Sequence, residues 1–299
     1  MAAPRDPEEL EARAHAAGEI AAATTVGPVH LTVSDLELSL DYYRSAVGLS
    51  VLDRAGGRAS LGAGDRQLLV LLEEPGAAPS LRHTGLYHFA LLVPERADLA
   101  RWLAHAIRDR VPLVGLSDHF VSEAIYLSDP DRHGIEIYRD RPREGWEGQV
   151  DSRLTTLPLD VDDLLGVLDD PAAEPFDALP ARTTMGHIHL RVAEIPETVR
   201  FYRDVLGFGL MAQLGNQAAF LAAGGYHHHL GANIWESAGA GPPPPGTAAL
   251  RRATIVLPDD RERDRLAARI EEHGYPVGQG DGGLSLADPS GNPLVLAVT

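Results

Sequence analysis

The stretch "VGPVHLTVSDLELSLDYYRSAVGL" (residues 26–49) recurs as "MGHIHLRVAEIPETVRFYRDVLGF" (residues 185–208), with the two copies in register throughout. In each copy a short alternating segment, typical of a β-strand, leads into a segment whose apolar residues have helical spacing. Tyr43 and Tyr202 occupy equivalent helical positions, and a glycine stands at Gly48 and Gly207 where each helix is expected to end. This self-similarity predicts an internally repeated fold.

Both halves of the chain continue in the same order after these copies. Strand-like segments separated by glycine-bearing turns come first, followed by a second strand, a second helix and a final hairpin. We therefore predict an α+β protein of four tandem βαβββ modules. The expected divisions are an N-terminal tail (1–24), an N-terminal domain (25–142), a linker (143–184) and a C-terminal domain (185–299).

The composition argues against several classes of partner and site. The chain has 26 Lys and Arg residues against 43 Asp and Glu residues, a formal charge of −17, and no basic stripe, so we expect neither nucleic acid nor an anionic membrane as a partner. No apolar run is long enough for a membrane span, and the first residues do not resemble a signal peptide, so a soluble, cytoplasmic protein is expected. Cysteine is absent, so any metal must be bound by His, Asp or Glu.

Two motifs give the chain a family resemblance. The modules open on G-x-V-H-L-x-V, as at residues 27–33, and close on D-P-x-x-x-G-I-E-I-Y, as at residues 129–138. The chain thereby resembles the vicinal oxygen chelate superfamily, which includes glyoxalases, bleomycin-binding proteins and extradiol dioxygenases. Within it, residues 26–299 most resemble two-domain catechol-2,3-dioxygenase-like proteins. The resemblance implies two half-open barrels of mixed β-sheet.

Three ionisable residues stand on otherwise apolar strands. Because side chains alternate along a strand, His30, His88 and Glu136 each point away from their apolar neighbours. Such a residue is more often hydrogen-bonded than ligating, but the resemblance implies that these three meet on the concave side of one barrel as metal ligands. Two histidines and one carboxylate suit Fe(II), or alternatively Mn(II), with coordination positions left open. An aromatic diol and dioxygen are then the expected reactants.

Two further residues are candidates for catalysis by resemblance. Tyr126 stands ten residues before Glu136, where extradiol dioxygenases keep a tyrosine that hydrogen-bonds a substrate oxygen. His119 is the counterpart of their acid–base histidine, although its spacing from Tyr126 departs from the family pattern. The alternative interpretations are a tyrosine packed at the barrel mouth and a solvated loop histidine.

The second half does not repeat the metal set. Its equivalents of His30, His88 and Glu136 are His189, Arg252 and Val295, whereas better-known two-domain extradiol enzymes keep the metal in this half. His227 and His229 could join His189 around a second cation, but hydrogen-bonded roles in a degenerate domain are favoured. Exposed module edges are compatible with a homodimer.

Three functions therefore stay open at this point. The first is a metal-dependent extradiol dioxygenase acting on a catechol-like diol. The second is another metalloenzyme of the superfamily, such as a glyoxalase-type isomerase or an antibiotic thiol transferase. The third is a noncatalytic protein that binds an aromatic compound or antibiotic.

Overall fold

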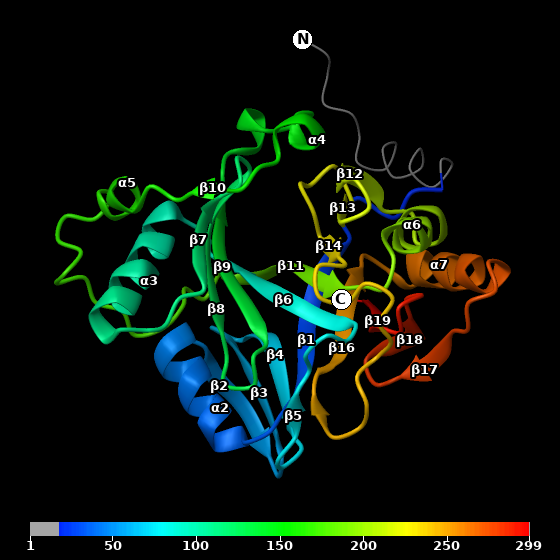
Figure 1. Ribbon diagram of the computed structural model, residues 1–299, viewed down its shortest axis with the longest axis horizontal. Coiled ribbons are helices and arrows are strands. Elements are labelled where there is room, and N and C mark those ends of the chain that lie inside the picture. Colours follow the sequence, from blue (N-terminus) through cyan, green and yellow to red (C-terminus); the bar gives the residue numbers. More distant parts are fainter. Residues whose placement is uncertain (1–17, 299) are drawn as a thin grey trace.

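Two large mixed β-sheets, with helices packed against them, make up the computed structural model (Figure 1). The structure describes residues 18–298, so most of the expected N-terminal tail lies outside the described residues. One of the sheets curls into a half-barrel. The α+β class and the mixed sheets predicted from the sequence are thus confirmed.

The eight-stranded sheet is built on the first strand of the chain. β1 pairs in parallel with β4 on one side and antiparallel with β16 on the other. The strand order across the sheet is β17 (Gly278–Gly280), β18 (Gly283–Ala287), β19 (Pro293–Val298), β16 (Leu250–Leu257), β1 (Thr25–Val33), β4 (Arg66–Glu73), β3 (Arg58–Ala63) and β2 (Ser50–Ala55).

The nine-stranded sheet has the same arrangement around β11, which pairs in parallel with β14 and antiparallel with β6. Its strand order is β10 (Leu157–Pro158), β7 (Gly115–Asp118), β8 (Ser122–Ser128), β9 (Gly134–Asp140), β6 (Gly85–Leu92), β11 (Thr184–Arg191), β14 (Leu230–Asn233), β13 (Ala218–Ala222) and β12 (Gly209–Leu214). A separate two-stranded pair joins β5 (Ala78–Pro79) and β15 (Thr247–Ala248).

Four main helical segments follow the predicted repeat. They are α2 (Leu36–Tyr42) with the π-helical η1 (Tyr43–Val47), α3 (Arg96–Asp109), α6 (Ile195–Val199) with the π-helical η3 (Arg200–Val205), and α7 (Asp260–Glu272). The segment between the halves adds η2 (Arg143–Gly145), α4 (Val150–Arg153) and α5 (Val161–Leu165). In Figure 1, α2 and α3 lie on one side of the molecule and α6 and α7 on the other. No helix within residues 18–298 is long and apolar enough to cross a membrane.

Each sheet takes strands from both halves of the chain. The eight-stranded sheet joins β1–β4 of the first half to β16–β19 of the second, whereas the nine-stranded sheet joins β6–β9 of the first half, with β10 at its edge, to β11–β14 of the second. Within each half, a buried tyrosine hydroxyl connects the modules: Tyr43 donates to Asp129 at 2.8 Å, and Tyr202 donates to Asp288 at 3.2 Å. A site on the nine-stranded sheet can therefore draw residues from both halves.

The apolar sides of the strands form the core with the helices. One continuous cluster contains Leu31 of β1, Phe89 of β6, Ile188 of β11 and Trp102 of α3, all buried. Burial of this apolar surface is the main stabilising contribution to such a fold. The alternate, polar side of each strand is left free for a site, as the period of two requires.

Candidate metal centre

Three potential ligand atoms converge on the polar side of the nine-stranded sheet. His88 Nε2 lies 3.0 Å from Glu136 Oε2, His187 Nε2 lies 3.1 Å from the same oxygen, and the two nitrogens are 3.3 Å apart. All three side chains are buried, and they are the group within residues 18–298 that could hold a metal ion. They come from β6, β9 and β11.

Strand register explains why these residues meet. Glu136 of β9 pairs with Ala90 of β6, and Ala90 pairs with His187 of β11, so the three residues form one row across the sheet. The small side chain of Ala90 leaves room between the carboxylate and the imidazole on either side. His88 precedes Ala90 by two residues and therefore points to the same side of the sheet.

The donor set fits a divalent cation. Ligand atoms about 2.1 Å from one ion and at right angles to one another lie about 3.0 Å apart, close to the separations observed. Two imidazoles and one carboxylate on one face are the ligands typical of metal sites that leave coordination positions open. The residues present thus form a site consistent with a divalent metal.

The charges of the set also suit a cation. Burial opposes ionisation of Glu136, but the neighbouring His187 and His88 offset it and hold the pKa of this carboxyl well below its usual range. Burial lowers the pKa of His187, although Glu136 acts in the opposite direction. A carboxylate that stays ionised beside an imidazole that stays neutral is the state that metal binding requires.

The surroundings of His187 restrict how its ring can turn. Its ring packs against His228 at 4.1 Å and against Tyr138 at 4.8 Å between centroids. Gly186 makes the second contact possible, since a Cβ there would lie 1.9 Å from the Tyr138 hydroxyl oxygen. The metal-facing nitrogen of His187 is therefore oriented by packing.

Comparisons with known proteins agree with this geometry. Residues 25–137 and 184–296 match the glyoxalase family described as the Glyoxalase/Bleomycin resistance protein/Dioxygenase superfamily. The chain belongs to this superfamily. The vicinal oxygen chelate resemblance predicted from the sequence is confirmed.

Individual relatives narrow the comparison. The chain is 42% identical over 281 residues to the catechol-2,3-dioxygenase of Bacillus subtilis (strain 168), an alignment that covers 92% of this chain and 97% of the relative. A candidate dioxygenase of Bacillus subtilis subsp. subtilis str. 168 has a similar fold, with a TM-score of 0.61 at 15% identity over 92% of this chain and 85% of the other. Glyoxalase I from Zea mays does too, with a TM-score of 0.56 at 16% identity over 92% of each chain.

His30 does not join His88 and Glu136, which corrects the expected ligand set. This residue lies on β1 in the other sheet, where its Nε2 is 3.2 Å from Arg252 Nη2. Burial, with the positive charge of Arg252 next, lowers the pKa of His30 to about 4. The physical reason is which strands pair. β1, which carries His30, pairs with β16, whereas β6, which carries His88, pairs with β11.

His187 was the residue that the sequence analysis missed. The family motif aligns His30 with His189. The potential ligand His187 lies two residues before His189, and the first copy has Pro28 at the equivalent position. The signal was present in "MGHIHLRV", because histidines two residues apart on one strand share a side. The site is consequently shared between the halves rather than confined to residues 25–142.

His119 and Tyr126 do come together beside the centre. Tyr126 pairs directly with Glu136, and its hydroxyl lies 2.7 Å from His119 Nε2. His119 Nδ1 is 2.8 Å from the carbonyl oxygen of Thr155, so Nδ1 carries the proton and Nε2 accepts from the tyrosine. Burial, followed by the negative charge of Glu136, raises the pKa of Tyr126 well above its ordinary value. Thr155 belongs to the segment expected to be only a linker.

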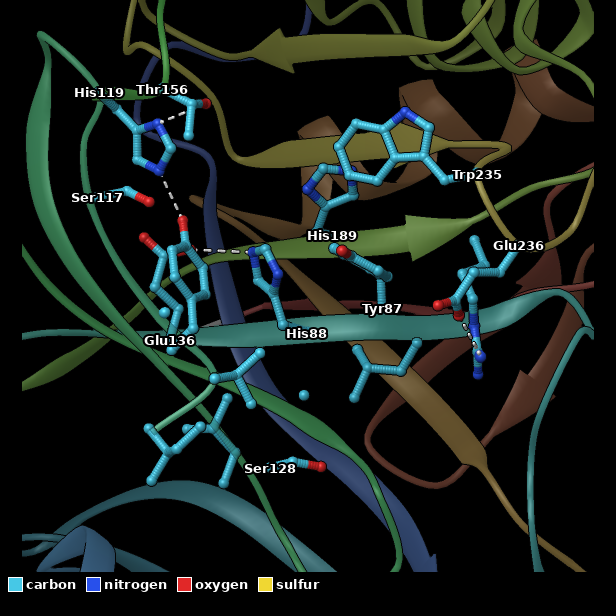
Figure 2. Close-up of a pocket in the computed structure, with 18 of the residues that line it drawn as sticks. Tyr87, His88, Ser117, His119, Ser128, Glu136, Thr156, His189, Trp235 and Glu236 are labelled. Carbon is cyan, nitrogen blue, oxygen red and sulfur yellow. Dashed lines mark hydrogen bonds and ion pairs between the residues drawn. The ribbon is translucent and has the colours of Figure 1, made fainter. Parts of the chain in front are cut away.

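A pocket of about 710 Å³ opens in front of these residues. Figure 2 shows His119 and Glu136 at one end, Tyr87, His189 and Trp235 further along, and Glu236 at the other end. The volume falls within the usual range for small-molecule sites.

The histidines near the end of the third module have hydrogen-bonding roles. His227 Nε2 is 2.7 Å from Asp140 Oδ1, and His229 Nδ1 accepts from the Ala223 amide at 3.1 Å. His189 lies on the pocket wall beside His88 instead of with these two. A second cluster of His227, His229 and His189 is therefore not formed in the described part of the chain.

Proposed function

We propose that the protein is a metal-dependent extradiol dioxygenase that opens the ring of a catechol-like diol. The observation that carries the proposal is the buried group of His88, Glu136 and His187 beside Tyr126 and His119. The catechol-2,3-dioxygenase relative at 42% identity supports the reaction type. Fe(II) is the proposed metal, with Mn(II) as the alternative, since both accept this ligand set.

The reaction adds both atoms of dioxygen to the diol and breaks the ring bond beside the two hydroxyl groups, giving a muconic semialdehyde. Bound at His88, Glu136 and His187, the metal would supply open coordination positions for the diol oxygens and dioxygen and would pass charge between them. No further reductant is needed, because the four electrons that dioxygen accepts come from the diol.

His119 and Tyr126 are proposed as the acid–base pair. The Thr155 carbonyl fixes the proton of His119 on Nδ1, which leaves Nε2 free to accept a proton that passes from a substrate hydroxyl through the Tyr126 oxygen. The same path can return a proton when the product forms. Tyr126 also holds the substrate oxygen by hydrogen bonding.

We also propose a division of the fold into repeated modules. We describe the chain as four βαβββ modules in two half-open barrels, with domain boundaries at 25–142 and 185–299. The strand orders of the two sheets, which correspond position by position apart from the additional β10, support this description.

The decisive experiment is metal content and oxygen incorporation on protein purified without oxygen or chelators. We expect about one equivalent of iron or manganese per chain and both atoms of labelled dioxygen in the ring-opened product. His187→Ala should lose the metal, whereas the matched variant His30→Ala should keep it. A metal-free wild type that also fails to take up Fe(II) would refute the proposal, and retention of metal by His187→Ala would refute this ligand set.

A further inference from the structure

A charged pair lies at the end of the pocket opposite the His119 and Tyr126 pair. Arg191 lines the pocket and is only 8% exposed, and its Nε is buried without a hydrogen-bond partner among the described residues. Its ion pair with Glu236 is long, at 3.5 Å, and the Glu236 side chain is 54% exposed. A largely buried guanidinium whose charge is only weakly paired is costly unless an anion in the pocket completes the pairing.

The same strand connects this pair to the metal centre. His187, His189 and Arg191 alternate along β11 and therefore point to one side of the sheet. Four residues of strand place the Arg191 backbone about 13 Å from that of His187. In Figure 2, Glu236 lies well away from Glu136 along the pocket, with the labelled aromatic residues between them.

An aromatic wall lines the space between the two ends. The Tyr87 ring centroid lies 5.2 Å from that of His189 and 5.4 Å from that of Trp235. All three rings line the pocket, and His189 Nε2 has no hydrogen-bond partner among the described residues. Such a wall suits a planar ring and an apolar arm, with polar groups at both ends.

We propose that Arg191 binds a carboxylate at the end of an arm carried by the aromatic diol. This inference rests on the proposed function and names its substrate class: diols with an anionic arm several atoms long. Arg191 is held in the pocket wall with its guanidinium paired only at long range to Glu236, and its planar donors match a carboxylate. Glu236 is more exposed and can turn into solvent when the carboxylate takes its place. The exposed Arg132 adds a second positive charge to the pocket lining.

The test compares two diols with the same arm, dihydrocaffeate, which carries a carboxylate, and its methyl ester, which is uncharged. Wild type should cleave the ring of dihydrocaffeate with a kcat/KM at least about 10-fold higher than that for the ester, chiefly through a lower KM. Arg191→Met should remove this ratio, and it should lower kcat/KM for plain catechol, which has no arm, much less than kcat/KM for dihydrocaffeate. Glu236→Gln should increase the ratio, because it removes the competing carboxylate.

A binding measurement isolates Arg191 from the chemistry. Phenylpropionate has the arm and carboxylate but no diol, so its binding to metal-free protein, followed by calorimetry, should be lost in Arg191→Met. The control is Arg182→Met, since Arg182 has a side chain 75% exposed and pairs with Glu95 outside the pocket lining. Arg191→Gln, which also removes the charge, serves as a second variant with the same expected loss if Arg191→Met does not fold.

The outcomes separate the two proposals. If no diol is cleaved but phenylpropionate binds through Arg191, the dioxygenase proposal fails and the anion site stands. If both diols are cleaved at equal kcat/KM and the Arg191 variants leave that ratio and phenylpropionate binding unchanged, the anion site is refuted and the dioxygenase proposal stands.

Discussion

The two sheets carry the same set of positions with different chemistry. In the nine-stranded sheet His88 pairs with His189, and Glu136 pairs with Tyr126. The equivalent pairs in the eight-stranded sheet are Arg252 with His30, and Val295 with Ser285. At the position of His187 the other copy has Pro28. The backbone is thus repeated, while the candidate metal set occurs once within residues 18–298.

This difference shows which residues the fold needs and which the site needs. Leu31 and Ile188, on the apolar sides of the two first strands, are both fully buried, so packing against the helices is kept in each copy. On the polar side, Arg252 approaches His30, where the other sheet has His88 beside His189. Fold and chemistry therefore occupy alternate residues of the same strands and can change independently.

Replacing a residue of the candidate metal centre with its equivalent from the eight-stranded sheet should have the largest effect on metal content and activity. Glu136→Val replaces the carboxylate with the residue found at Val295, so metal content should fall from about one equivalent per chain to below about 0.1, with loss of ring cleavage. Elemental analysis and a catechol assay check this. Thermal unfolding without metal is the folding control, because removing a buried charge should not destabilise that state. Full metal occupancy in the variant would show that the histidines suffice.

A smaller effect on activity is expected at Tyr126, which pairs with Glu136 on the neighbouring strand. Tyr126→Phe removes the hydroxyl that contacts His119 but no ligand, so kcat should fall about 100-fold while metal content stays unchanged. Stopped assays with catechol and metal analysis on the same sample measure the two quantities. The matched change Tyr87→Phe, on the same pocket but away from His119, should leave kcat nearly unaltered. Equal losses in both variants would contradict a specific role for the contact between the Tyr126 hydroxyl and His119.

Most of the fold could be predicted because the apolar periodicities repeat. The strand of His88, the helix after it and the hairpin ending in Glu136 follow from alternation and turn residues within one module. The approach of Tyr126 to Glu136 also follows, because a hairpin sets its own register. Local sequence thus placed His88 and Glu136 on their strands, whereas the roles predicted for them, and for His119 and Tyr126, came from the family resemblance.

The third ligand depended on which modules share a sheet. His30 and His187 lie within equivalent strands, and alternation treats them alike. Only the long-range pairing of β6 with β11, rather than with β1, decides that His187 reaches the metal centre. Such pairing spans about a hundred residues of chain and leaves no periodic signal in either strand.

The two halves also differ in the tyrosine contacts that connect their modules. Asp288 accepts from the amides of Ser290 and Asn292 as well as from Tyr202, whereas Asp129 accepts from the His133 amide and from Tyr43. Tyr43→Phe should therefore lower the free energy of unfolding by about 2 kcal/mol, more than Tyr202→Phe does. Urea unfolding of both variants measures the difference. A larger loss in Tyr202→Phe would contradict this ranking of the two contacts.

The smallest expected effect on activity is at His30 in the eight-stranded sheet, where the change is a pH dependence of stability. Because burial and Arg252 lower the pKa of His30 to about 4, the folded protein takes up this proton later than the unfolded chain does as pH falls. Between pH about 6.5 and about 4 the unfolded state binds more protons, so His30 makes the free energy of unfolding decrease as pH falls through this window. His30→Gln should flatten that part of the stability profile without changing metal content at neutral pH. If the slope is unchanged, His30 is protonated in the folded state despite its neighbour Arg252, and the two sheets would then differ less in charge than their residues indicate.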